Sequence, residues 1–260
     1  MNMLARIGGV ACALLFLCAS HSAHAMEIVE LFASDITVQS DGSVSVVETI
    51  EYNFDTNERH GIFRIIPKSH PESSSAWYLD RYIDIKVTGV TKGGVEEPYV
   101  VTDESGHVNI KIGDADATIR GVHTYVISYT LRGALSYPKQ LPPELYWNVN
   151  GGEWEVPTRV VRATLHDGGL LLPERACYRG KEEERTSCAT RLVENGVEFE
   201  VTEILPGEMM TFAHALKDGS VEVLRLERTR SFFLALILGI VWLVGLVVYV
   251  YRYRTAFRND

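Results

Sequence analysis

The chain has 260 residues, of which 46% are hydrophobic and 23% are charged, and its formal net charge is −9 at pH 7. This acidic balance argues against nucleic acid and anionic lipid as direct ligands, because both repel negative charge. Residues 26–230 hold 33 of the 34 acidic and 21 of the 25 basic residues, a net charge of −12. Such a region would suit a cationic partner, although ordinary solubility is the simpler explanation.

Residues 1–25 have the features of a secretory signal peptide. Arg6 precedes an apolar run at 7–17, and the small residues Ala23 and Ala25 mark a cleavage site after Ala25. The run is too short to cross a bilayer comfortably, since a spanning helix needs about 20 apolar residues. An uncleaved anchor is the alternative interpretation. The leader predicts that the residues following it are exported.

Residues 26–155 are predicted to form a β-sandwich ectodomain. Apolar and polar side chains alternate along 44–54, and the turn at 40–43 joins this stretch to 36–38 as a hairpin. Further strand-like runs lie between glycine-containing turns, at 82–90, 99–102, 108–112 and 124–131. Short strands with turns at this spacing are typical of a β-sandwich.

A second β-rich stretch covers residues 156–230, with strand-like runs at 159–165, 187–193, 197–204 and 210–216. It contains Cys177 and Cys188, an even pair that predicts a disulfide in an exported domain. Closing a loop of this size stabilises a fold by roughly 2–3 kcal/mol. The sequence leaves open whether 26–155 and 156–230 are two β-subdomains or one large sandwich.

Residues 231–251 are predicted to form one transmembrane helix. The segment 232–251 has no charged residue and covers about 30 Å at about 1.5 Å per residue, which matches the hydrocarbon core. Tyr249, Tyr251 and Tyr253 crowd its C-terminal end, as in an interfacial aromatic belt. With its N-terminal side exported, the protein would cross the cell membrane once, with the ectodomain in the periplasm or outside the cell. The tail at 252–260 would then be cytoplasmic.

Several phrases of the ectodomain occur in the same order as in a known bacterial family. They are Asp-Gly-Ser-Val at 41–44 with Val-Glu-Thr-Ile-Glu-Tyr-Asn-Phe at 47–54, Gly-Ile-Phe-Arg-Ile-Ile-Pro at 61–67, Thr-Tyr-Val-Ile-Ser-Tyr at 124–129, Leu-Tyr-Trp-Asn-Val at 145–149 with Gly-Gly-Glu-Trp-Glu-Val-Pro at 151–157, and Leu-Pro-Gly-Glu at 205–208 with Met-Thr-Phe at 210–212. Over about residues 28–220 the chain resembles the predicted membrane proteins that carry domain of unknown function 2207.

The resemblance implies architecture and location, and it provides no catalytic residue because the family has no established activity. Members typically continue beyond a transmembrane helix with further membrane and cytoplasmic sequence, which has no counterpart in these 260 residues. Members are often encoded beside LemA-type membrane proteins, so the resemblance also implies LemA-type proteins as partners.

His60 and Arg64 are the first candidate ligand-binding residues. They flank the phrase Gly61-Ile62-Phe63, and a histidine and an arginine near a glycine suit an anion or a carboxylate. The alternative is a strand entry in which the glycine fixes a turn.

Trp147, Asn148, Asn150 and Trp154 are the second candidate set. Indole faces can bind the apolar faces of sugar rings while neighbouring amides recognise hydroxyl groups. The alternative is that both tryptophans anchor the core, with Asn150-Gly151 as a hairpin turn between them.

The sequence contains no recognisable catalytic or metal-binding constellation. The six histidines between residues 26 and 230 do not lie at ligand spacing, and no cofactor is expected. The leading hypothesis is a membrane-anchored extracytoplasmic protein of the bacterial envelope that binds or scaffolds other envelope proteins without catalysis of its own. The alternative is a cell-envelope hydrolase acting on wall polymers, since many carboxylates are present and their spacing in space is not visible in the sequence.

Overall fold

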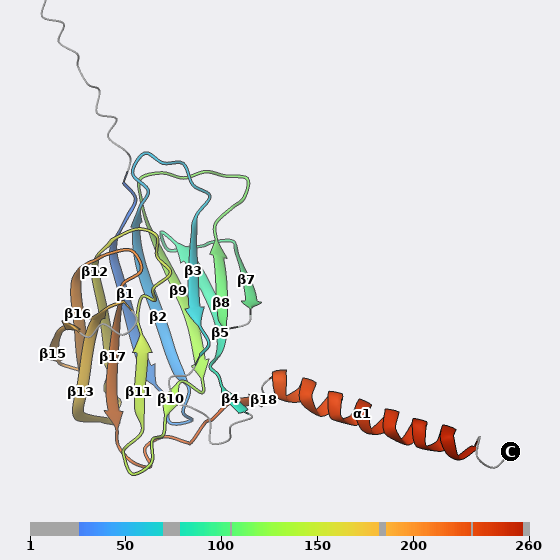
Figure 1. Cartoon of the computed structure of the whole chain (residues 1–260). Coiled ribbons are helices and arrows are strands. Elements are labelled where there is room, and N and C mark those ends of the chain that lie inside the picture. Colours follow the sequence, from blue (N-terminus) through green and yellow to red (C-terminus); the bar gives the residue numbers. More distant parts are fainter. Residues whose placement is uncertain (1–25, 70–78, 105, 182–185, 230, 257–260) are drawn as a thin grey trace, which may run out of the picture.

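A β-sandwich followed by one long helix makes up the described part of the chain in the computed structural model (Figure 1). The structure describes residues 26–69, 79–104, 106–181, 186–229 and 231–256. The predicted signal peptide and the end of the predicted cytoplasmic tail lie outside these residues. The prediction of an all-β domain with one C-terminal apolar helix is confirmed.

One layer of the sandwich is an eight-stranded sheet in the order β15-β16-β12-β1-β2-β9-β5-β6. Within it, β1 pairs in parallel with β12, and the other pairs are antiparallel. The strands are β1 (Ile28–Val38), β2 (Val44–Asn53), β5 (Asp84–Lys92), β6 (Val95–Glu96), β9 (Val122–Arg132), β12 (Thr158–His166), β15 (Ala189–Val193) and β16 (Gly196–Ile204).

The facing layer consists of two separate sheets that lie side by side (Figure 1). The larger has the order β10-β11-β17-β13-β14 and the smaller has the order β3-β8-β7. Their strands are β10 (Leu135–Ser136), β11 (Glu144–Asn148), β17 (Met209–Leu216), β13 (Leu171–Gly180), β14 (Thr186–Ser187), β3 (Ile62–Pro67), β8 (His107–Ile112) and β7 (Tyr99–Glu104). Phe199 of β16 stacks on Phe212 of β17 at 4.6 Å between ring centroids, which joins the two layers.

Side-chain alternation explains why these strands face one another. In β2 the alternate residues Val44, Val46, Glu48, Ile50 and Tyr52 are buried, while the residues between them are more exposed. Because side chains of a strand point alternately to its two faces, this pattern covers one face of the sheet with apolar groups. Those groups form one core with their counterparts from the facing layer.

Strands from both sides of residue 155 pair with each other. Val29 to Thr37 of β1 lie beside Thr158 to His166 of β12, and β11 pairs with β17. The boundary near residue 155 therefore falls between strands that share sheets. The division into 26–155 and 156–230 stays a prediction.

The predicted disulfide between Cys177 and Cys188 is present, with 5.3 Å between the two Cα atoms. Cys177 belongs to β13 of the five-stranded sheet, and Cys188 lies between β14 of that sheet and β15 of the eight-stranded sheet. The bond therefore ties down the chain where it crosses from one layer to the other.

The membrane helix is joined to the sandwich through a paired strand. The helix α1 (Ser231–Ala256) follows β18 (Glu227–Thr229), and β18 pairs antiparallel with β4 (Leu79–Arg81). Residues Phe233–Arg254 have a mean hydropathy of 2.8 and are long and apolar enough to cross a membrane. Only one residue separates the last strand of the domain from this helix.

The chain that leads into β18 is held, together with this strand, along the end of the sandwich by further contacts. The Glu222 amide donates to the Ser40 carbonyl at 2.8 Å, and the Tyr82 amide donates to the Leu226 carbonyl at 3.1 Å. The guanidinium of Arg225 lies over the Tyr137 ring at 5.3 Å and donates to the Tyr137 carbonyl at 2.8 Å. We call residues 220–229 the pre-membrane segment.

Gly42 provides a test of how firmly the pre-membrane segment is held. Its φ is +76°, and a Cβ atom there would overlap with the Glu222 carbonyl oxygen. Gly93 is the matched control, because its φ is also positive, at +58°, but nothing lies within 4 Å of its Cβ position. We expect Gly42→Ala to lower the free energy of unfolding by about 1–3 kcal/mol more than Gly93→Ala. Guanidinium unfolding of the detergent-solubilised protein measures both, and equal losses would contradict a close contact at Gly42.

Candidate functional site

The most concentrated polar chemistry of the described chain lies inside the sandwich, around Arg64. Arg64 is in β3, between Ile62 and Ile66, and all three point to the inner face. Arg64 is 1% exposed, and Glu48 on the inner face of β2 is 0% exposed. A buried charge is tolerated only when it is paired and hydrogen-bonded, so the partners of Arg64 decide what the site can do.

All five N–H donors of Arg64 have acceptors. Nε and Nη2 donate to the two carboxylate oxygens of Glu48, at 2.8 and 2.7 Å. Nη2 also donates to the Val149 carbonyl at 2.9 Å, and Nη1 donates to the carbonyls of Ile65 and Asn150 at 2.7 and 2.9 Å. A guanidinium has no further donor, so this arrangement leaves Arg64 none for a ligand.

Glu48 is held from the eight-stranded sheet as well. The Tyr129 hydroxyl of β9 donates to Glu48 Oε1 at 2.6 Å. Burial opposes the charged form of Arg64, but the nearby Glu48 carboxylate outweighs it and raises the pKa of Arg64 above its ordinary value. The pKa of Tyr129 lies well above its ordinary value, mainly because of burial and secondly because of the nearby Glu48 carboxylate. Arg64 is therefore charged and the tyrosine neutral at physiological pH.

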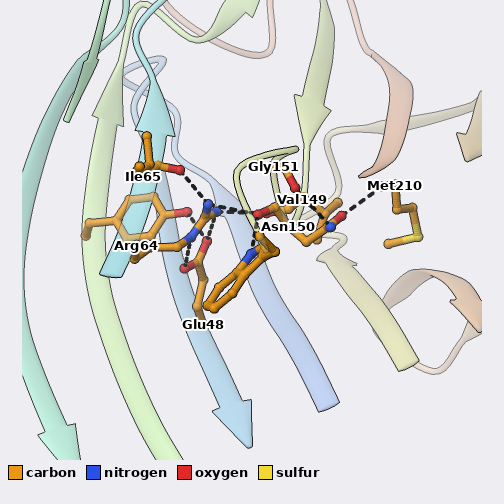
Figure 2. A network of polar contacts seen from close by, with 9 residues as sticks. Glu48, Arg64, Ile65, Val149, Asn150, Gly151 and Met210 are labelled. Atoms are coloured by element: carbon orange, nitrogen blue, oxygen red, sulfur yellow. Dashed lines mark hydrogen bonds and ion pairs between the residues drawn. The ribbon is translucent and has the colours of Figure 1, made fainter. Parts of the chain in front are cut away.

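Asn150 carries the network into the five-stranded sheet (Figure 2). Its Oδ1 accepts from the Met210 amide of β17 at 2.8 Å, and its Nδ2 donates to the Glu208 carbonyl at 3.1 Å. The Asn150 carbonyl accepts from Arg64 and also from Trp154 Nε1, at 2.9 Å in each case. The loop after β11 is thereby fixed to β17 on one side and to β3 on the other.

The network has no reacting group poised for chemistry in this geometry. The carboxylate, the guanidinium and the phenol are all paired to one another and removed from solvent. A general acid or base must come within hydrogen-bond reach of a substrate proton. The observed contacts instead suit a rigid junction between three sheets.

The structure separates the residues that the sequence proposed as ligand-binding. His60 is exposed, and its Nδ1 lies 3.2 Å from the Asp114 carbonyl and 2.9 Å from the Ala117 carbonyl, in a loop contact. Arg64, four residues on, points into the core. The two side chains are therefore not brought together as one anion site.

The tryptophan phrase is divided in the same way. Trp147 is buried in β11, and Asn148 Oδ1 accepts from the Thr211 hydroxyl at 2.7 Å. Trp154 is half-buried and lies within 6.1 Å of the Phe32 ring and 6.2 Å of the Tyr52 ring. The hairpin turn at Asn150-Gly151, part of the alternative interpretation, is not formed: β11 pairs with β10 and β17, and the next strand begins only at Thr158. The Asn150 side chain bonds instead to the Met210 amide and the Glu208 carbonyl. The ligand-binding role of His60, Arg64, Trp147, Asn148 and Trp154 stays a prediction.

The sequence analysis named Asn150 but missed Glu48 and Tyr129, which complete the network. Glu48 had a readable signal, because it occupies an inward position of β2 between Val46 and Ile50. A carboxylate in the apolar register of a strand calls for a buried cation. Within the described ranges, no group of three His, Cys, Asp or Glu side chains is placed to hold a metal ion.

Fold and polar core together define a class of protein, an all-β sandwich domain fastened to a membrane helix. Residues 29–216 match the family described as predicted membrane protein (DUF2207) N-terminal domain, and the chain belongs to this family. It is 27% identical over 177 residues to the uncharacterized protein YciQ of Escherichia coli K12, covering 65% of this chain and 27% of that protein. The chain therefore spans about a quarter of this relative's length.

Solved structures with a partly similar course of the chain include two enzymes of low sequence identity. Native leukotriene A4 hydrolase from Saccharomyces cerevisiae gives a TM-score of 0.42 at 12% identity, covering 73% of this chain and 29% of that one. An M1 zinc metallopeptidase from Deinococcus radiodurans gives 0.39 at 9% identity, covering 73% and 42%.

Removing the cation from the buried pair tests the structural role of Arg64. We expect Arg64→Met to lower the free energy of unfolding by about 3–5 kcal/mol, because it leaves the Glu48 carboxylate buried without a cation. The double variant Glu48→Leu with Arg64→Met removes both charges, and we expect it to be more stable than Arg64→Met alone. Unfolding by guanidinium chloride, followed by tryptophan fluorescence, measures four proteins: the unchanged protein, Arg64→Met, Glu48→Leu and the double variant. A double variant as unstable as the sum of both single variants would argue against the coupling.

Proposed function

We propose that this membrane protein works in the bacterial envelope as a scaffold, with an exported sandwich that binds other envelope proteins and performs no chemistry of its own. The observation that carries the proposal is the pairing of β18 with β4 directly before the membrane helix. A domain linked through a flexible stalk would sample many heights and angles above the membrane. Here the last strand of the domain and the helix are one residue apart, which favours a surface presented at a set height.

The position of β1 relative to the membrane helix supports the proposed leader cleavage. β1 runs over ten residue steps from Ile28 to Val38, about 33 Å at about 3.3 Å per step. Its far end leads into the turn at Ser40, which accepts from the Glu222 amide of the pre-membrane segment. The start of β1 and the membrane helix therefore lie at opposite ends of the sandwich (Figure 1). An uncleaved anchor directly before Met26 would have to reach the bilayer from the distal end.

Partners with a basic surface suit this domain best. Residues 26–230 carry a net charge of −12, and complementary charge speeds encounter and disfavours wrong partners. Among envelope proteins, LemA-type membrane proteins are the proposed partners, on the strength of the family relationship.

Reporter fusions test the proposed orientation. A reporter that works only in the cytoplasm should be active when it is fused after Asp260 and inactive when it is inserted at Gly168, in the exposed loop after β12. The physical reason is that an exported leader places the sandwich outside and leaves the residues after α1 inside. The opposite pattern of activities would overturn the orientation.

A flexible insertion tests whether the scaffold needs a fixed height. Twelve Gly/Ser residues inserted after Arg230 would give a spread of about 20 Å between the sandwich and the helix. The same insertion in the β5–β6 turn, between Gly93 and Gly94, is the matched control, since nothing lies within 4 Å of the Cβ positions there. We expect the complex solubilised from native membranes to shrink toward the free protein only with the first insertion, as measured by native electrophoresis. A complex of unchanged size would show that tethering alone suffices.

A further inference from the structure

We propose that the outer edge of β7 is a docking site for an extended segment of another envelope protein, which adds to the β3-β8-β7 sheet as a further strand. The segment would carry apolar residues at alternate positions and a Lys or Arg that meets Asp103 and Glu104. This inference rests on the proposed function, because it names the surface that the scaffold uses.

The backbone of β7 has one side turned away from the sheet. Glu104 lies opposite His107 in the register of β7 and β8, and at the other end the Gly113 amide donates to the Pro98 carbonyl at 2.8 Å. Hydrogen-bonded positions of an antiparallel pair recur at every second residue. Tyr99, Val101 and Asp103 therefore direct their N–H and C=O groups outward, and no strand of the described residues pairs with that edge.

The side chains of β7 fit a strand that is meant to be covered. All six residues are exposed, and Val100 reaches 62% exposure. The run Tyr99, Val100, Val101, Thr102 consists of residues that favour strands. Natural edge strands are usually protected by proline, a bulge or inward charges. β7 has neither a proline nor a bulge in its pairing with β8, and its one inward charge, Asp103, is paired with Lys68 near the end of the strand. An exposed Phe63 lies on the same face as Val100, across Lys111 of β8, and widens the apolar surface.

The charged residues of β7 determine which charged residues the added strand can carry. The end of β7 carries Asp103 and Glu104, and both side chains remain well exposed beside their partners Lys68 and His107. The domain as a whole is strongly acidic. A basic residue in the added strand would lie against these carboxylates, whereas an acidic segment would be repelled.

A second copy of this chain fits the edge less well. Two copies would pair through β7 as antiparallel strands about a two-fold axis perpendicular to the sheet. The membrane helix leaves from one end of the strands (Figure 1), so the two helices would point in opposite directions. Copies anchored in one membrane need both helices to point the same way, which disfavours this arrangement.

The edge strand β15 offers a matched control on the opposite side of the molecule. Val193 lies opposite Gly196 across a two-residue turn, so Leu192 directs its N–H outward by the same logic as Val101. Leu192 is 71% exposed, comparable with Val100. Proline at either position removes an outward N–H that bonds to no neighbouring strand, and proline is tolerated on edge strands for that reason.

Photo-crosslinking in native membranes tests the proposal on the full chain. The probe is p-benzoylphenylalanine, introduced in place of Val100 or, as the control position, in place of Leu192. We expect an adduct from position 100 whose crosslinked peptide alternates apolar residues and contains Lys or Arg. Val101→Pro should reduce its yield to background, and Leu192→Pro should leave it unchanged. Equal melting temperatures of the two proline variants would show that the fold is retained.

A charge variant keeps the test decisive if Val101→Pro does not fold. Glu104→Lys should then reduce the adduct, while Glu194→Lys, at the exposed β15–β16 turn, should not. The proposal is overturned by an adduct that both proline variants leave unchanged, by an adduct with a second copy alone, or by no adduct from position 100. If the native complex persists with Val101→Pro, the docking site is overturned but the proposed scaffold function is not. If no native complex exists at all, both proposals are overturned.

Discussion

The buried ion pair of Arg64 and Glu48 is the interaction on which the arrangement of the three sheets depends. A charge inside a sandwich is strongly unfavourable unless its partners are complete, and here every donor of the guanidinium is used. Those partners come from β2, from β3 and from the loop after β11. Because a bidentate pair tolerates little displacement, the position of each sheet is specified by the other two.

An arginine is needed there because the layer that faces the eight-stranded sheet consists of two separate sheets. We call the boundary between these two sheets the seam. β3 and β11 face the same eight-stranded sheet, but they are not hydrogen-bonded to each other as strands. Backbone carbonyls along such a seam need donors, since buried unpaired carbonyls are costly. Arg64 donates to three of them, at Ile65, Val149 and Asn150. The side chain thus replaces the strand ladder that the seam lacks.

Local patterns in the sequence predicted the strands, the membrane helix and the disulfide, because each depends on residues that are near in the chain. The alternation in β2 and the uncharged run in α1 are of this kind. The seam could not be predicted in the same way: Asn150 meets the amide of Met210, 60 residues away, and β1 meets β12 across more than a hundred. Glu48 and Arg64 are an intermediate case, since each stands in an apolar register and each therefore requires a partner of opposite charge. The alternative of a hairpin between Trp147 and Trp154 was not formed, because the chain after β11 starts no new strand before Thr158. The Asn150 side-chain amide holds it to β17 and the preceding loop instead.

Rigidity at the seam and attachment at the membrane have a combined effect. The ion pair fixes the small sheet that contains β7 to the eight-stranded sheet, and the contacts of Ser40, Tyr82 and Tyr137 fix the pre-membrane segment to the end of the same sandwich. β7 is thus linked to the membrane helix through packed elements, with Arg230 the one link outside the described residues. An exposed strand binds best when it is already ordered, because the partner alone then loses conformational freedom. A loose seam would spread the β7 edge over many positions and weaken any strand addition there, which connects a buried arginine to the chemistry of an exposed edge.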